Sequence, residues 1–528
     1  MRSISAAEPR VARPALVSLA AAFAVLVALV GGLVSAPGPA AANGWQWHSI
    51  PRPALVAGLE SDSPRRRAFA VRAFGYRRDR QVVPRLVAML DDEGEATEVR
   101  TEILRALGRI GDPAAGPALV RALADGGSSE IAAEAADALG ALGAPATLPA
   151  LLEALAGKRP LVVRTRIVAA LGSFPEEPAI AALAGLLRNE RSRSLRRRAI
   201  RALGRMATPA AAPPLLAALE TARSDRVRAE IVDALARARA PAARRPLIEL
   251  LAATADPRLR VRITVALGAL ADGSVAPTLI RLLDDDSPPV QFFAARGLGR
   301  SGDRRGVEPL RRLYRDVARR DAALTPAEIE ADPVALLADL SLRYEIVRAL
   351  HRIDAPAGLD VFLDAARRRD LRRDSAAHLR LNEGVYQLRR AAVVALGYTG
   401  SEAAARTLIA DLLADRDFRI RAVAVQALGV LGADGAVAAL VPRLDDDTAE
   451  VRWRAAAVLG RLGKPGAASA LAARLGDAHP EVRRQAVLSL GYLGAVEARE
   501  RVAALARGDA DAAVREAARE TVRLLGGG

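Results

Sequence analysis

The sequence has no cysteine and only four histidines among its 528 residues. Without cysteine there is no disulfide, no thiolate metal site and no thiol nucleophile. The histidines are His48, His351, His378 and His479, which stand far apart along the chain. A metal site requires several such ligands close together, so we expect no metal and no other cofactor.

Motifs that carry catalysis are also missing. The chain has no glycine-rich phosphate loop, no G-x-S-x-G turn and no H-E-x-x-H pair. Acidic clusters such as residues 284–286 fall between expected helices, where turns explain them. We therefore expect no catalytic residues and a protein that is not an enzyme.

Aromatic residues and lysine are scarce. Aromatics make up 3% of a chain that is 51% hydrophobic, so alanine, leucine and valine must form the core, which favours closely packed helices over a β-sandwich. Only Lys158 and Lys464 are lysines, so the net charge of +16 is almost entirely arginine. GC-rich coding explains such a composition; an acidic partner or an anionic membrane surface is the functional alternative.

The first 42 residues differ from the rest. Arg2, Arg10 and Arg13 precede an apolar run over residues 15–34, and prolines and three alanines follow it up to Ala42. This order is typical of a secretory signal peptide cleaved after Ala42. A run of about 20 apolar residues can also span a bilayer, so an uncleaved membrane anchor is the alternative. Both interpretations place the rest of the chain outside the cytoplasm, in the periplasm or the extracellular space.

A short phrase recurs about every 32 residues: Val-Arg, a variable and alanine-rich stretch, then Ala-Leu-Gly. A fixed period of this length indicates stacked repeats whose core continues from one repeat to the next. The closing positions are Gly75, Gly108, Gly140, Gly172, Gly204, Ala236, Gly268, Gly299, His351, Gly397, Gly429, Gly460, Gly491 and Gly526.

One copy shows how each repeat is built. Residues 436–444 and 451–459 have apolar side chains at helical spacing, which predicts a pair of helices. The acidic residues 445–447 between them supply polar groups to the start of the second helix. We expect Gly460 to end that helix in the left-handed conformation.

This pattern resembles the HEAT repeat, in particular the short bacterial variant named after phycobilisome lyases. The resemblance implies an all-α solenoid, a superhelix of about 14 stacked helix pairs with an armadillo-like fold, whose second helices line the concave side. It also implies a ladder of Asp and Arg side chains along the stack. The ladder candidates are Asp415 with Arg421, Asp446 with Arg452, and Asp477 with Arg483.

The resemblance brings three other activities into consideration. Some relatives are bilin lyases, an activity that no motif excludes but that an exported chain would not exercise on a cytoplasmic substrate. Others are deoxyhypusine hydroxylases, which hold iron with His-Glu pairs; no histidine here is followed by glutamate. HEAT-like DNA glycosylases use concave arginines, and residues 196–205 are similarly rich in arginine.

Two intervals of the repeat are much longer than the others, those that end at His351 and Gly397. They divide the repeats into residues 53–303, an irregular segment over 304–387, and residues 388–526. Residues 324–328 predict a turn and a new helix start within the irregular segment. Insertions in repeat proteins form loops on one side of the stack and often bind partners.

Positions two, three and six residues after the opening valine vary between repeats, so we expect them to face solvent on the concave side. Acidic residues at 102, 134, 137, 230 and 233 interrupt any basic track that a nucleic acid would need. Several of the few aromatics fall at these positions beside arginines, a combination typical of protein-binding sites. The predicted partner-binding residues are Phe292, Phe293, Arg296, Tyr344, Arg348, Trp453 and Arg454.

The sequence thus predicts an exported, non-catalytic scaffold or adaptor. It would bind a protein or peptide through its concave face and central insertions, and the excess of arginine suits an acidic partner. We expect no nucleic acid as partner, and contact with a membrane only through residues 15–34. The alternatives are an enzyme similar to phycobilisome lyases and nucleic-acid binding through arginine-rich concave patches.

Overall fold

A computed structural model describes residues 47, 49–125, 127–368 and 376–526. All regular elements in these ranges are helical, which confirms the all-α class. The expected signal peptide or anchor, with its apolar run 15–34, lies outside the described residues. Within them, no helix combines the length and the apolar character that crossing a membrane requires.

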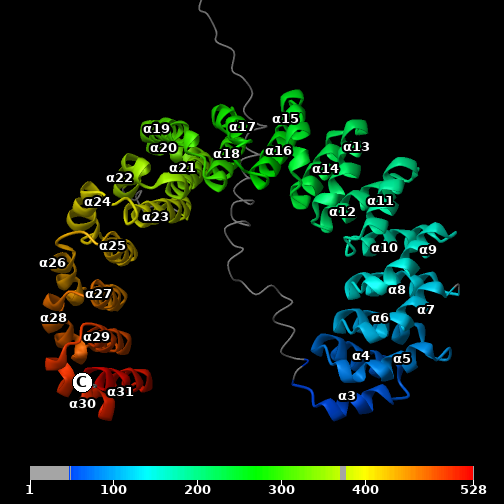
Figure 1. Cartoon of the computed structure of the whole chain (residues 1–528), viewed down its shortest axis with the longest axis horizontal. Helices are drawn as coiled ribbons and strands as arrows, with labels where there is room; N and C mark the ends of the chain where they lie inside the picture. Colours follow the sequence, from blue (N-terminus) through cyan, green and yellow to red (C-terminus); the bar gives the residue numbers. More distant parts are fainter. Residues whose placement is uncertain (1–46, 48, 126, 369–375, 527–528) are drawn as a thin grey trace, which may run out of the picture. The chain divides into compact units, whose positions relative to one another are not determined.

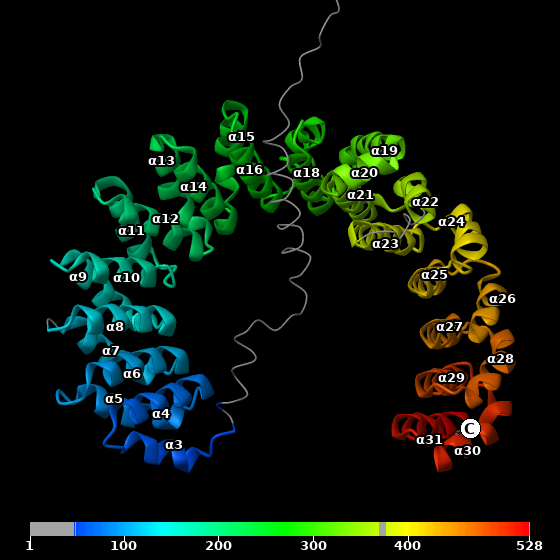
Figure 2. The same ribbon diagram turned by 180° about the vertical axis from the view of Figure 1, so that it is seen from behind.

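The described residues form two compact units, an N-terminal unit up to residue 270 and a C-terminal unit from residue 271. Each is a stack of seven helix pairs among the described residues, with the first helices of the pairs in one row and the second helices in another (Figures 1 and 2). In each unit the second helices form the inner, concave row. The prediction of a solenoid of helix pairs is confirmed.

The pairs of the N-terminal unit have first helices of eight to 13 residues. The first helices are α3 (Arg52–Leu59), α5 (Val83–Asp91), α7 (Gly116–Ala124), α9 (Leu148–Ala156), α11 (Glu177–Asn189), α13 (Ala212–Thr221) and α15 (Arg244–Ala253). The second helices are α4 (Pro64–Arg77), α6 (Thr97–Ile110), α8 (Ser129–Leu142), α10 (Leu161–Leu171), α12 (Arg193–Arg205), α14 (Asp225–Ala238) and α16 (Pro257–Ala269).

The C-terminal unit repeats the plan with shorter first helices at most positions. These are α17 (Ala276–Arg281), α19 (Val307–Ala323), α22 (Leu359–Arg367), α24 (Glu402–Thr407), α26 (Ala436–Leu440), α28 (Ala468–Ala473) and α30 (Arg499–Gly508). The second helices are α18 (Pro288–Ser301), α21 (Pro333–Asp354), α23 (Ala376–Leu396), α25 (Phe418–Leu431), α27 (Ala449–Leu462), α29 (Pro480–Tyr492) and α31 (Ala512–Gly526). The short α20 (Pro326–Ala331) is additional.

The core of each unit lies between the two rows of helices. In α27, the opening Val451 and the residues four and eight positions later, Ala455 and Leu459, are fully buried. Residues at this spacing share one face of a helix, and that face packs on the first helices. Small alanine side chains let the helices approach closely, which explains why so few aromatics are needed.

The expected Asp and Arg ladder is present, with its pairs offset by one repeat. Arg421 donates to the carbonyl of Asp415 in its own repeat (2.9 Å) and binds the Asp446 carboxylate of the next repeat through Nε and Nη2 (2.9 and 2.8 Å). In the same way, hydrogen bonds from Arg483 hold the pKa of Asp509 below its usual value. The carboxylate pairs are Arg389–Asp415, Arg421–Asp446, Arg452–Asp477 and Arg483–Asp509.

The closing glycine has a different role from the one expected. Gly460 lies inside α27, which ends at Leu462, and Gly463 has the left-handed backbone with φ of 65°. A Cβ on Gly460 would come within 2.9 Å of the Cα of Ser489 in the neighbouring α29. Consecutive second helices thus touch at Gly460, where a side chain would clash, and the left-handed turn follows three residues later.

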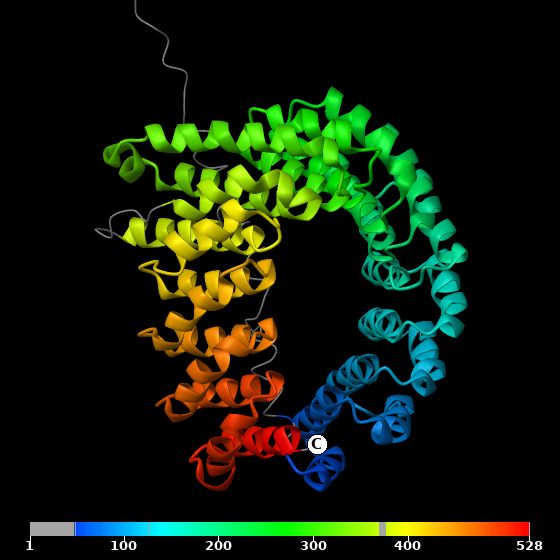
Figure 3. The same cartoon turned by 60° about the vertical axis from the view of Figure 1, so that its left-hand side comes forward.

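The described part of the irregular segment is mostly helical. The predicted helix start at residue 325 is confirmed by a capping box, in which Thr325 and Glu328 bond to each other's backbone N–H at the start of α20. The second helices α21 and α23 are lengthened to 22 and 21 residues. Their added turns pack together, since a Cβ on Gly384 would lie 3.2 Å from Leu337. Figure 3 shows this added length projecting beyond the later helices of the C-terminal unit.

Candidate functional site

The solvent-facing side of each second helix is set by three positions. Residues three, six and ten places after the opening residue lie at about 300°, 240° and 280° around the helix, and so form one stripe. We call these positions the inner stripe. The position two places after the opening residue lies at about 200°, on the flank that faces the neighbouring repeat.

Five of the predicted binding residues lie on the adjacent helices α18 and α21. Phe292 is only 6% exposed, so the expectation that it faces solvent is wrong: it occupies the flank two places after the opening Val290. Phe293 is half-buried and meets Phe292 edge to face, with ring centroids 5.2 Å apart. Arg296 is also half-buried. These residues, Tyr344 and Arg348 are brought together on neighbouring helices.

Arginine side chains cover the aromatic rings of the predicted site. The Arg348 guanidinium carbon lies 5.5 Å from the centre of the Tyr344 ring. On α27, the Arg454 guanidinium carbon lies 4.8 Å from the Trp453 ring, and its Nη2 binds Glu450 at 2.7 Å. Two helices, α23 and α25, stand between α21 and α27, so Trp453 and Arg454 do not join the cluster around Tyr344.

A buried carboxyl group accompanies the cluster on α21. Glu345 is 2% exposed, and its Oε2 lies 3.7 Å from Arg348 Nη1. Burial raises the pKa of Glu345, and the charges of Arg348 and Arg296 oppose the increase. The same stripe position in α6 holds Glu102, which accepts hydrogen bonds from Arg72 at 3.1 Å and Arg109 at 3.2 Å.

Exposed apolar residues of the C-terminal inner stripe are absent from the predicted set. Val394, Tyr398, Val430, Tyr492 and Leu524 are 38%, 55%, 51%, 70% and 63% exposed. We call these five residues the apolar line; four lie on α23, α25, α29 and α31, and Tyr398 lies in the turn that follows α23. Val394 stands six places after the opening residue of its helix, and the other four stand ten places after theirs. For Tyr398, Val430 and Tyr492, the tenth place directly follows the closing glycine. The sequence contains this pattern, at a place beyond the three positions from which the binding residues are predicted.

The inner stripe of the N-terminal unit is mostly charged, although Phe69, Tyr76 and Val265 are exposed on it. The acidic residues that were expected to interrupt a basic track each pair with an arginine, and the pairs connect neighbouring second helices. They are Arg72–Glu102, Arg105–Glu134, Arg166–Asp137, Arg201–Glu230 and Arg262–Asp233. These carboxylates therefore neutralise much of the arginine charge on this face.

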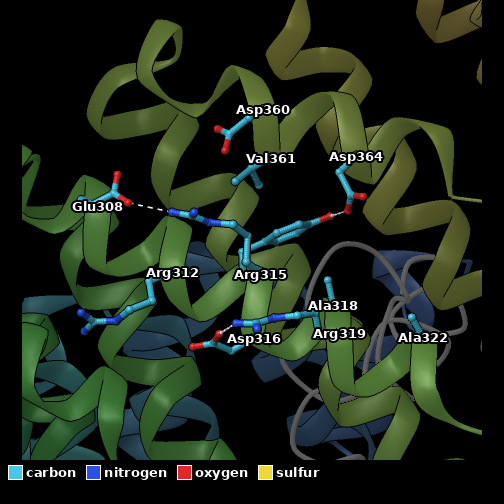
Figure 4. A pocket seen from close by; sticks show the side chains of 11 residues that line it. Glu308, Arg312, Arg315, Asp316, Ala318, Arg319, Ala322, Asp360, Val361 and Asp364 are labelled. Atoms are coloured by element: carbon cyan, nitrogen blue, oxygen red, sulfur yellow. Dashed lines mark hydrogen bonds and ion pairs between the residues drawn. The ribbon is translucent and has the colours of Figure 1, made fainter.

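A surface groove of about 910 Å³ lies between α19 and α22, in the irregular segment. Figure 4 shows ion pairs along its lining, between Arg315 and Glu308 and between Arg319 and Asp316. At its edge Tyr314 donates to Asp364 (2.7 Å). Other charged side chains of the lining pair with residues outside it, Arg312 with Asp284 and Asp360 with Arg311.

A buried ionic cluster adjoins the groove. Arg343, 2% exposed, stands at the ladder position of α21 and binds Asp321 at 3.1 Å and Asp364 at 3.0 Å. A second carboxyl group, that of Asp339, lies beside Asp321. Burial and the charge of Asp321 raise the pKa of Asp339 to about 7. This cluster links α19, α21 and α22. Across the described ranges, no three His, Asp or Glu side chains converge as ligands of a metal ion would.

The fold is therefore an α-solenoid of helix-pair repeats. Seven overlapping segments of the chain match HEAT repeats: residues 52–134, 96–172, 125–194, 180–260, 244–325, 378–452 and 437–523. The chain belongs to the HEAT-repeat family. The subtype named after phycobilisome lyases stays a prediction. Residues 326–377, which contain α20, α21 and α22, fall outside these matches.

Solved structures similar in fold are much more distant in sequence. A chain of the Kap95:Nup1 complex is 13% identical with a TM-score of 0.45, over 91% of this chain and 78% of that chain. A structure of Kap95p with RanGDP is 13% identical with a TM-score of 0.37, over 90% of this chain and 61% of that chain. A structure of Kap121p is 16% identical with a TM-score of 0.39, over 85% of this chain and 49% of that chain. No curated protein matches the sequence.

Proposed function

We propose that this chain is an exported scaffold without catalytic activity that binds a protein or peptide on the concave side of its C-terminal unit. The observation that carries the proposal is the apolar line, with side chains between 38% and 70% exposed on the inner stripe of four of the last five repeats; α27, the exception, has Arg461 at the tenth place. Exposed apolar residues that cluster on one face are typical of sites for protein partners. Covering each of these side chains would contribute about 1–2 kcal/mol of binding energy.

Neighbouring residues suit the rim of such a site. Phe293, Tyr344 and Trp453 are half-buried aromatics on the same row of helices, and Arg348 and Arg454 lie over two of the rings. Aromatic and arginine side chains contribute most to protein interfaces because they combine apolar area with directed polar groups. The lengthened helices α21 and α23 extend the surface next to the apolar line.

Affinity capture from envelope extracts tests the proposal. The Tyr398→Ala/Tyr492→Ala variant should lose about nine-tenths of the captured protein, since two covered rings correspond to at least a tenfold change in affinity. The matched control is Leu161→Ala/Val496→Ala, two side chains that are 54% and 61% exposed and lie away from this surface. An unchanged set of captured proteins in the tyrosine variant, or recovery of nucleic acid alone, would contradict the proposal.

The aromatic residues predicted from the sequence need a separate test. Phe293→Ala and Trp453→Ala should each weaken binding of the captured protein with the helical content unchanged. Unchanged affinity in both variants would remove these residues from the site and leave the apolar line as its extent.

Export is proposed from the order of charged and apolar residues at the N-terminus. Cell fractionation with sequencing of the purified protein's N-terminus distinguishes the two forms. A cleaved signal peptide gives a soluble protein that begins after Ala42, whereas an anchor gives a membrane fraction that retains residues 15–34. Recovery of the intact chain in the cytoplasm would refute both.

A further inference from the structure

Helix α12 departs from the charge pairing of the N-terminal unit. Its inner stripe consists of three arginines, Arg198, Arg201 and Arg205. Arg201 lies 3.7 Å from the Glu230 carboxylate of α14. Arg198 and Arg205 have no carboxylate within ion-pair distance in the part of the chain that the structure describes. The arginines of α4, α6 and α16 on the same stripe do have such partners.

The two unpaired arginines approach a carboxylate that is already bound. Asp137 of α8 pairs with Arg166 of α10, and its charge also interacts with Arg198 and Arg205. Arg205 donates a hydrogen bond to the carbonyl of Ala169, which carries no net charge. One carboxylate thus faces three guanidinium groups, and two positive charges are left over.

This excess has a physical cost that an anion would relieve. Burial and the nearby charge of Arg198 lower the pKa of Arg205, which reflects the repulsion between them. Arginine stays protonated in spite of such repulsion, so the guanidinium groups keep their charge and their free N–H donors. Carboxylates bind guanidinium groups through short, charge-assisted hydrogen bonds.

We propose that Arg198 and Arg205 form a binding site for the carboxylate side chains of an acidic protein segment, which lies across α8, α10 and α12 on the inner stripe of the N-terminal unit. This site is separate from the apolar line and does not rest on the function proposed for it.

The flanking charges favour an acidic protein segment over a nucleic acid. A phosphodiester chain carries a charge at every nucleotide and requires a continuous basic track. Here Glu134 lies on one side of the site, and Glu230 and Asp233 lie on the other. A protein segment can place a few carboxylates over Arg198 and Arg205 and present neutral or basic residues to these neighbours.

Fluorescence anisotropy with the full chain tests the site. The probe is a fluorescein-labelled peptide of six glutamates alternating with glycines, compared with its glutamine counterpart at about 0.02 M and about 0.15 M salt. The Arg198→Gln/Arg205→Gln variant should bind the glutamate peptide about tenfold more weakly than the original chain, because two charge pairs are lost. The glutamine peptide should show no comparable binding to either.

The control variant is Arg193→Gln/Arg196→Gln. It removes the same charge from the same helix, and both residues are exposed and lie off the inner stripe. This control should bind the glutamate peptide within about twofold of the original chain. Unaltered helical content and melting temperature in both variants show that α12 remains folded.

Several results would overturn the proposal. These are no binding of the glutamate peptide by the original chain, equal weakening in the two double variants, and equal binding of the glutamine peptide. The site would be assigned to nucleic acid if a single-stranded oligonucleotide of matched charge bound more tightly than the glutamate peptide. Its affinity would also have to be lost in the Arg198→Gln/Arg205→Gln variant.

Discussion

Replacing the closing glycine of one repeat tests whether consecutive second helices really touch there. Gly140 of α8 faces Ala170 of α10, and a Cβ built on Gly140 would lie 2.7 Å from the Cα of Ala170 and 2.8 Å from its Cβ. Backbone atoms cannot rotate away as a flexible side chain can. Gly140→Ala therefore has to push α8 and α10 apart.

The magnitude follows from comparing two glycines. Gly185 lies inside α11, and a Cβ there would meet nothing within 4 Å. Gly185→Ala should stabilise the chain by about 0.5–1 kcal/mol because alanine favours the helix. Gly140→Ala has the same helix preference and the same effect on the unfolded chain, but adds an overpacking cost of about 1–3 kcal/mol. The difference between the variants isolates the contact.

Urea unfolding followed by circular dichroism measures both variants against the original chain. Hydrogen exchange adds the location, and protection should fall in α8 and α10 for Gly140→Ala alone. If Gly140→Ala proved as stable as Gly185→Ala, with protection in α8 and α10 unchanged, the close approach of the two helices would be refuted.

Three further predictions concern single residues. Ala207 has a left-handed backbone (φ of 50°), so Ala207→Gly should raise the free energy of unfolding by about 0.5–1 kcal/mol in urea titration. The folded chain holds a proton on Asp339 with a pKa of about 7, above that of an unfolded aspartate. Stability should therefore fall as pH rises from about 4 to about 7, by up to about 4 kcal/mol, and Asp339→Asn should flatten this slope in thermal melts. Arg452→Met leaves the Asp477 carboxylate without its partner at 2.9 Å and should cost about 2–4 kcal/mol in urea titration.

Each of these three has a result that would contradict it. Lower stability of Ala207→Gly would mean that the left-handed turn is not strained. If Asp339→Asn had the same pH slope of stability as the original chain, another group would carry the proton. Full stability of Arg452→Met would mean that the ladder contributes nothing to folding.

The sequence predicts the repeat well because its period and its core are both local. Opening valines, the alanines four places later and the leucines eight places later must share a helix face, as Val451, Ala455 and Leu459 do. The resemblance to HEAT repeats implies the Asp and Arg positions of the ladder. It does not imply their partners, because Arg421 binds the carboxylate of the next repeat, a contact that depends on how repeats stack.

The errors share one physical origin, the contact between neighbouring second helices. Gly460 was expected to end its helix, yet it marks the point where α29 comes close. Phe292 was expected in solvent, yet its flank faces the adjacent repeat and is buried. Tyr398 and Tyr492 are absent from the predicted site because the exposed side of a helix can be assigned only when the flank that the neighbouring helix covers is known. The sequence of a single repeat does not show which of its flanks the neighbouring repeat covers.

The ladder also determines how the chain should come apart. From Arg389 to Asp509, each arginine pair ties one repeat to the next without a gap among the described residues. In the N-terminal unit the corresponding position of α8 is Ala132, and Arg196 of α12 has no ion-pair partner in the described ranges. Stability in a solenoid is a sum over neighbouring interfaces, so unequal interfaces reduce cooperativity. The C-terminal repeats from α23 onward should unfold as one block, whereas the N-terminal unit should unfold with lower cooperativity.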